Sequence, residues 1–238
     1  MRYMIMIAAL LSISLCQTPA VQAERIPQTS GARVPLSFIG VRGESVLIYA
    51  NVVYERKAEL VEPILDWGGA MQWAIMRPIV GAGLVRGISG PLKADDNYRQ
   101  MIVRAFEHAK QLRTRDLPNG RLWTLFEFVG GLTVKDPQDA EAALAIAFLS
   151  VQEGRRIEPI MILGGLDSQG RLTAVADFNA HVTSTFNLGF RKVIVPLGQG
   201  SEISGPLQQR IEKDHLTIIE AATLKDLDAL VMTESPRD

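Results

Sequence analysis

Apolar and polar residues follow two kinds of pattern along this chain, one typical of strands and the other of helices. Over residues 34–54 they alternate loosely around Gly40 and Gly43, which predicts a β-hairpin. After Asp95 and Asp96 the apolar residues recur at helical spacing, which predicts a helix with one buried face. The apolar positions of that helix are Met101, Ile102, Ala105, Phe106, Ala109 and Leu112.

The second half of the chain alternates short apolar strands with helices. Asp136 and Pro137 are suited to the start of a nearly all-apolar helix, and Gly154, Gly189 and Thr223 mark further helix ends. This alternation predicts one α/β (α+β) domain in which helices pack on a sheet. The strands are expected at 122–129, 159–163, 171–175, 192–196 and 216–220, the helices at 140–152, 178–188, 206–213 and 223–232, and a flexible loop at 198–205.

The first residues have the layout of a secretory signal peptide. A basic start, a short apolar core and small residues before Glu24 predict cleavage after Ala23. The core is shorter than the roughly 20 apolar residues that span a bilayer, so we expect a periplasmic or secreted protein with no membrane anchor after cleavage. Cys16 is the only cysteine, so the mature chain would have no disulfide. Residues 24–33 are expected to be a flexible lead and 233–238 a tail.

Composition and motifs limit the partners. Hydrophobic residues form 47% of the chain and the net charge is −1, which favours a well-packed core and gives no basic surface for nucleic acid. His108, His181 and His215 lack the paired spacing of a metal site. No glycine-rich run continues into the lysine of a phosphate loop, so neither an ATPase nor a cofactor is expected. The apolar segment 60–84 is either an insertion folded over the domain or a partner surface.

Two segments resemble the proteolytic domain of Lon proteases. The first is 164–172, Gly-Gly-Leu-Asp-Ser-Gln-Gly-Arg-Leu, and the second is 188–196, Leu-Gly-Phe-Arg-Lys-Val-Ile-Val-Pro. Lys135 and Asp136, followed by a small-residue helix and Gly154, extend the likeness backward. Asp136-Pro137 before an alanine-rich helix is also similar to the Lon-like domain of RadA recombination proteins, which is regarded as non-proteolytic. The resemblance implies a Lon-like sheet with packed helices over residues 34–232.

The positions that correspond to the Lon catalytic residues have changed. Asp139 stands at the position of the nucleophilic serine, His181 at that of the catalytic lysine, and Gly164 at that of the threonine that supports the lysine. A Ser-Lys dyad needs a hydroxyl and a deprotonated amine, and attack by a carboxylate on an amide would give a reactive anhydride. The resemblance further implies that Asp139 and His181 approach each other.

Several functions remain open on these residues. Asp139 could simply stabilise the helix N-terminus, and His181 could be a buried, hydrogen-bonded histidine. We expect a non-proteolytic homologue that binds peptide or unfolded protein segments by adding a strand at a sheet edge. One alternative is an ATP-independent serine-type endopeptidase that recruits Thr183 or Ser184 beside His181. Another is a scaffolding protein that forms a homo-oligomeric ring.

Overall fold

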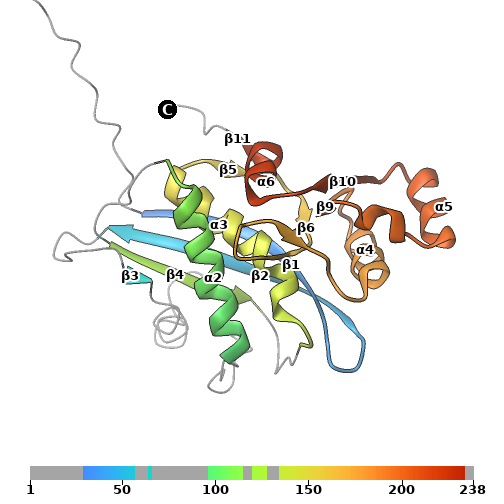
Figure 1. Cartoon of the computed structure of the whole chain (residues 1–238), viewed down its shortest axis with the longest axis horizontal. Helices are drawn as coiled ribbons and strands as arrows, with labels where there is room; N and C mark the ends of the chain where they lie inside the picture. Colours follow the sequence, from blue (N-terminus) through green and yellow to red (C-terminus); the bar gives the residue numbers. More distant parts are fainter. Residues whose placement is uncertain (1–28, 57–63, 66–95, 115–119, 128–133, 234–238) are drawn as a thin grey trace, which may run out of the picture.

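The computed structural model describes residues 29–56, 64–65, 96–114, 120–127 and 134–233. The predicted signal peptide, almost all of the apolar segment 60–84 and the tail after 233 lie outside the described residues, so the predictions for them stay predictions. Figure 1 shows helices and strands mixed along the described chain, which confirms the α/β class. Among the described residues, no helix is both long and apolar enough to span a membrane.

A four-stranded sheet forms one layer of the molecule. β1 (Thr29–Ile39) and β2 (Ser45–Arg56) form a long antiparallel hairpin, as the alternating pattern predicted. β2 also pairs with β4 (Gly120–Glu127), and β4 with the short β3 (Ile64–Leu65). β1 begins at Thr29, inside the segment expected to be a flexible lead. That part of the expectation is wrong, because residues 29–33 pair with β2.

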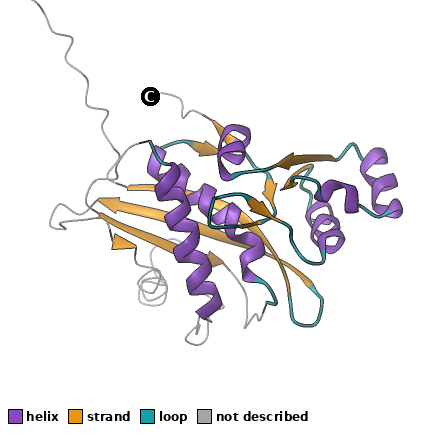
Figure 2. Ribbon diagram, viewed as in Figure 1, coloured by secondary structure: helices purple, strands orange, loops and turns teal. Residues whose placement is uncertain are grey.

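Two parallel helices, α2 (Asp96–Leu112) and α3 (Glu141–Glu153), lie over this sheet (Figures 1 and 2). α3 is buried on all sides, since α2 covers one side and the sheet the other. The helix ends at Gly154, whose φ is 65°. The helix does not begin directly after Asp136 as expected. A 3-10 turn, η1 (Pro137–Ala140), comes first, and the Asp136 side chain makes no capping hydrogen bond.

The rest of the chain builds a smaller parallel sheet with the strand order β10-β9-β6. The strands expected over 159–163, 171–175, 192–196 and 216–220 are present, although the first two shorten to two residues each. Residues 172–173 do not join this sheet but pair with residues 165–166 in a separate two-stranded antiparallel sheet. The last helix has the predicted cap, since Thr223 and Asp226 exchange side-chain and backbone hydrogen bonds. The elements are β5 (Arg156–Ile157), β6 (Met161–Ile162), β7 (Gly165–Leu166), β8 (Leu172–Thr173), α4 (Phe178–Asn187), β9 (Lys192–Pro196), α5 (Gly205–Lys213), β10 (Thr217–Ala221), α6 (Leu224–Val231) and β11 (Met232–Thr233).

The segment 198–205, expected to be a flexible loop, is partly ordered. It contains the 3-10 turn η2 (Gln199–Glu202). Gln199 is buried, and its side-chain amide pairs with the backbone of Val175. Val175 N donates to Gln199 Oε1 at 3.1 Å, and Gln199 Nε2 donates to Val175 O at 2.8 Å. The turn therefore holds the segment before α4 in place.

Both faces of the β1–β2 hairpin are covered at its twisted end. Leu36 and Phe38 of β1 belong to the core cluster that α3 shares, while Leu47 of β2 packs against a second cluster built around α4. Ser37 is the register partner of Leu47 and lies on the same face of the hairpin. The hairpin thus brings Ser37 toward α4.

Candidate functional site

Asp139, at the position that resembles the Lon serine, lies in the 3-10 turn before α3 and is only 6% exposed. Its backbone carbonyl accepts a hydrogen bond from Gly164 N at 2.9 Å. Burial raises the pKa of the Asp139 carboxyl above its ordinary value of 3.8, and the nearby His181 and the Ala176 backbone N–H oppose this shift. The carboxylate therefore faces the interior and does not cap its helix toward solvent.

His181 projects from α4 between two polar partners and is 0% exposed. Its Nε2 lies 3.7 Å from Asp139 Oδ2, so the two residues approach each other as expected. That separation is longer than a hydrogen bond, and Nε2 has no hydrogen-bond partner among the described residues. On the other side of the ring, Nδ1 lies 2.8 Å from Ser37 Oγ. An acid, an imidazole and a hydroxyl thus meet inside the fold.

Ser37 is the residue of this cluster that the sequence did not indicate. It alternates with Leu36 and Phe38 along β1, so its side chain points to the face that a hairpin on a one-sided core would leave in solvent. In the fold α4 covers that face, and Ser37 is 3% exposed. The alternation could have placed Ser37 opposite Leu36, but only the packing of α4 brings it to His181, 144 residues along the chain.

The other expected site residues have different positions. The hydroxyl that pairs with the His181 ring is that of Ser37, while Thr183 and Ser184, the hydroxyls that the sequence suggested, are half-buried on α4. Gly164, at the position of the supporting threonine, has a φ of 140° and joins Asp139 to Ala142 through backbone hydrogen bonds. It links elements here and offers no hydroxyl.

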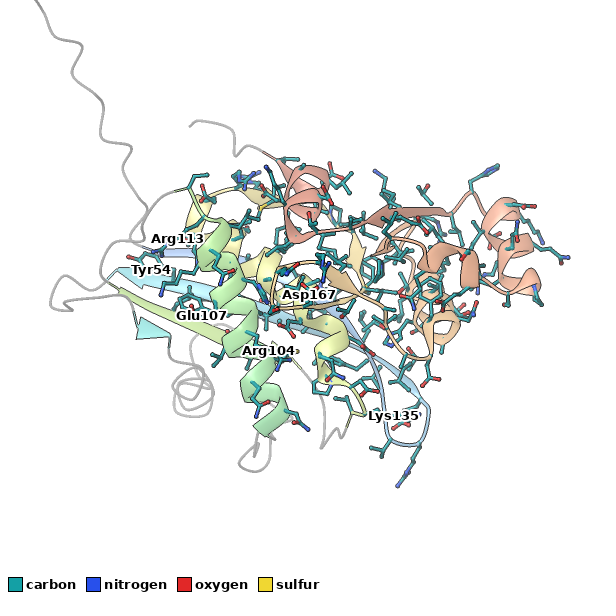
Figure 3. All side chains as sticks on the ribbon, in the orientation of Figure 1. Tyr54, Arg104, Glu107, Arg113, Lys135 and Asp167 are labelled. Atoms are coloured by element: carbon teal, nitrogen blue, oxygen red, sulfur yellow. The ribbon has the colours of Figure 1, made fainter. Side chains whose placement is uncertain are left out.

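A short segment, residues 173–177, connects β8 to α4 and lies against Asp139; we call it the strap. The Ala176 backbone lies near the Asp139 carboxylate, and the backbone of Val175 pairs with the Gln199 side-chain amide. Asp177 forms an ion pair with Lys135, 3.3 Å from Nζ, and Figure 3 shows Lys135 near the tip of the β1–β2 hairpin. Asp177 has a φ of 49°, in the left-handed region that non-glycine residues seldom adopt. The side chains of Gln199 and Lys135 therefore hold the strap beside the site.

A second polar cluster adjoins the site at the start of α3. The Glu141 side chain is 1% exposed, and Arg104 of α2 donates to both of its carboxylate oxygens at 2.8–3.1 Å. His108 Nε2 lies 4.0 Å away. Burial raises the pKa of the Glu141 carboxyl, and Arg104 and His108 oppose this shift. The cluster fixes the N-terminal end of α3, and with it the position of Asp139.

The raised pKa of Asp139 gives a pH-dependent prediction. Between its unfolded and folded pKa values, the folded protein binds more protons than the unfolded chain, so this group's contribution to stability falls as pH rises through that window. Asp139→Asn removes the titration. We expect the stability of the variant relative to the wild type to increase as pH rises from about 4 toward neutrality. Urea unfolding of both proteins across this pH range measures the difference in their free energies of unfolding. A difference that stays constant with pH would contradict the prediction. The titration of Glu141 does not affect this difference, because both proteins contain Glu141.

Among the described residues, no three His, Cys, Asp or Glu side chains come close enough to hold a metal ion together. The side chains that meet at the site are a carboxylate, an imidazole and a hydroxyl. An imidazole between an acid and a hydroxyl can act as a general base, provided that a substrate reaches the hydroxyl.

Comparison with known proteins gives a distant link. No protein-family model matches the sequence. The chain is similar to the DNA repair protein RadA of Synechocystis sp. (strain ATCC 27184 / PCC 6803 / Kazusa), with 34% identity over 91 residues. The match covers 37% of this chain and 18% of RadA, so it spans less than a fifth of the length of that relative. The similarity supports a distant relationship to a Lon-like or RadA domain.

Proposed function

We propose that this chain is a Lon-like domain that binds extended polypeptide and does not hydrolyse it by the Lon route. The supporting observation is Asp139: the position of the Lon serine carries a carboxylate that is 6% exposed and directed inward. Attack by that carboxylate on a peptide would give an anhydride, and the described surroundings offer no group that would manage it. A Lon-like domain that does not hydrolyse peptides can still bind them.

The strap offers the surface for such binding. Thr173 ends β8 and pairs with Gly165, and the next residue, Ala174, is exposed. Among the described residues, Ala174 has no hydrogen-bond partner for its N–H or C=O. An extended peptide laid beside Thr173 and Ala174 would pair with these groups as an added strand. Such binding depends on main-chain groups and therefore suits unfolded segments of varied sequence.

The alternative is an ATP-independent serine-type endopeptidase. It is favoured by one observation, the 2.8 Å separation between Ser37 Oγ and His181 Nδ1. A nucleophile must come within about 3–3.5 Å of the scissile carbonyl carbon. Ser37 is 3% exposed and His181 0%, and a polypeptide main chain needs an open path over several residues. We therefore expect binding without cleavage.

A fluorescent unfolded casein tests the proposal. We expect its anisotropy to rise saturably with the purified chain in the absence of ATP, while gel electrophoresis shows casein of unchanged length. Ala174→Arg places a bulky cation on the strap, and we expect it to weaken binding about tenfold or more, a loss of about 1.4 kcal/mol.

Ala229→Arg is the matched control, because Ala229 is equally exposed but lies on α6. Binding should be unchanged in this variant. Cleavage of casein would favour the endopeptidase instead. Equal binding by Ala174→Arg and the wild type would remove the strap as the binding surface.

We also propose that the domain works outside the cytoplasm. The support is the signal-peptide layout of residues 1–23, and the mature chain should begin at Glu24. N-terminal sequencing of the protein recovered from the periplasm or medium measures this, and recovery of the chain only in the cytoplasm with Met1 intact would contradict it.

A further inference from the structure

Three buried side chains that the proposed binding does not use lie in a line inside the fold. Asp139, His181 and Ser37 are 6%, 0% and 3% exposed, and they come from η1, α4 and β1. We propose that they form a latent acyl-transfer site, in which Ser37 accepts the acyl group of a small activated ester that enters beneath the strap. This inference goes beyond polypeptide binding and does not require it.

The proton positions favour a nucleophilic hydroxyl. An ionised carboxylate only accepts hydrogen bonds, so the tautomer with the proton on His181 Nε2, 3.7 Å from Asp139 Oδ2, is the favoured one. Nδ1 is then unprotonated and accepts the Ser37 hydroxyl proton across 2.8 Å. In the Ser-His-Asp triads of proteases the two ring nitrogens have the opposite assignment. The chemistry is preserved, because either nitrogen of a neutral imidazole can be the acceptor.

The reaction step balances with water as the second reactant. Ser37 Oγ attacks the ester carbonyl carbon and forms a new C–O bond, while its proton moves to His181 Nδ1. The bond from the carbonyl carbon to the leaving oxygen breaks, and the alcohol or phenol departs with that proton or as its anion. Asp139 remains ionised and stabilises the imidazolium. Water then hydrolyses the acyl-Ser37 ester and releases the acid.

Access depends on the strap. Ala174, Ala176 and Asp177 are exposed, yet the Ala176 backbone lies near the Asp139 carboxylate. The strap backbone therefore lies between solvent and the acid of the cluster. Two side chains hold the strap, namely the Gln199 amide and the Lys135 ammonium. Its displacement would admit a small acyl group, whereas a polypeptide would need a much wider opening.

The side chains around the site indicate the ligand class. Ser37 and His181 are buried. The second core cluster around α4 contains Val182, and Leu47 packs against this cluster. A neutral, short acyl chain suits this lining. An activated leaving group, such as a phenolate, suits it further because its departure needs little help from a proton donor.

The full chain is incubated with p-nitrophenyl acetate, and the adducts are located by peptide mass mapping. We expect a burst of p-nitrophenolate and one acetyl group on the peptide that contains Ser37. Ser37→Ala should lose this adduct. His181→Gln, which can still accept a hydrogen bond but is not a base, should lose it too while the circular dichroism stays native. Ser168→Ala, at an exposed turn, is the matched control and should label like the wild type.

Two further variants separate access from activation. Gln199→Ala releases Val175, so we expect acetylation of Ser37 to become several-fold faster. The thiol of Ser37→Cys reports access independently through its reaction with iodoacetamide. If that thiol reacts while folded wild type gains no acetyl group on Ser37, the hydroxyl is not activated and the proposal fails. If the thiol does not react either, the proposed entry beneath the strap is wrong. Neither result bears on casein binding at the outer face of the strap.

Discussion

Replacing Phe148 by alanine is expected to lower the free energy of unfolding by about 3–5 kcal/mol. Phe148 is 0% exposed, and its ring makes an edge-to-face contact with Phe106 of α2 at a centroid distance of 5.6 Å. Deleting the ring leaves a cavity between the two helices, and the surrounding backbone can close it only in part. Urea unfolding followed by circular dichroism measures the loss.

Val103→Ala is the control for this substitution. Val103 lies on the same helix pair but is 44% exposed, so its truncation should change stability by no more than about 0.5 kcal/mol. A loss below about 1 kcal/mol for Phe148→Ala would mean that α3 is not packed as described. Because Asp139 lies in the 3-10 turn that leads directly into α3, such a result would also remove the geometric basis of the candidate site.

Replacing Arg104 by methionine should have the second-largest effect, a loss of about 1–3 kcal/mol at neutral pH. Glu141 would keep its buried carboxylate and lose the guanidinium that binds both oxygens, leaving the His108 ring, with Nε2 4.0 Å from Oε1, beside it. The expected loss is smaller than for a fully buried pair, because the Arg104 side chain is 45% exposed and solvent screens part of the interaction.

The pH dependence of this loss identifies its cause. Burial raises the pKa of Glu141 above 4.5, and without Arg104 the shift should grow. The folded variant would then bind a proton more tightly than the unfolded chain, so its stability falls as pH rises through the enlarged window and recovers on acidification. Urea unfolding at weakly acidic and neutral pH measures this. The same loss at both values would show that lost packing, not an uncompensated charge, is responsible.

Two controls accompany Arg104→Met. Lys110→Met removes a surface cation that lies 3.9 Å from Glu107, with both side chains about half exposed, and should change stability by no more than about 0.5 kcal/mol. Combining Arg104→Met with Glu141→Gln removes the buried charge together with its partner, so part of the lost stability should return. Failure of the double variant to recover any stability would argue against the charge as the cause.

Local sequence signals predicted most of the elements in the described part of the chain. The period-2 alternation fixed the β1–β2 hairpin, and the helical spacing from Met101 to Leu112 fixed α2, because each pattern follows from backbone geometry. Gly154 and the Thr223 cap also ended and began helices as predicted, since both act through their own backbone neighbours. The sequence erred where ends depend on packing, as at the start of α3 and over 198–205.

The candidate site divides in the same way. The spacing of the segments that resemble the Lon proteolytic domain was enough to single out Asp139 and His181 and to expect that they lie close together. It could not supply Ser37, because alternation along β1 says which face a side chain occupies but not what covers that face. Likewise, the neighbours of a hydroxyl in the sequence do not indicate whether it is exposed to solvent.

The sequence by itself determined the α/β class and the strand and helix periodicities, and it placed Asp139 and His181 at the positions that resemble the Lon catalytic residues, because each depends on residue identity and short-range geometry. Only the tertiary structure decided that α4 closes over the second face of the hairpin, that the strap lies on Asp139, and that Ser37, His181 and Asp139 meet out of solvent. Those contacts join segments that are far apart along the chain, where no local pattern constrains the partners and packing of the whole core selects them.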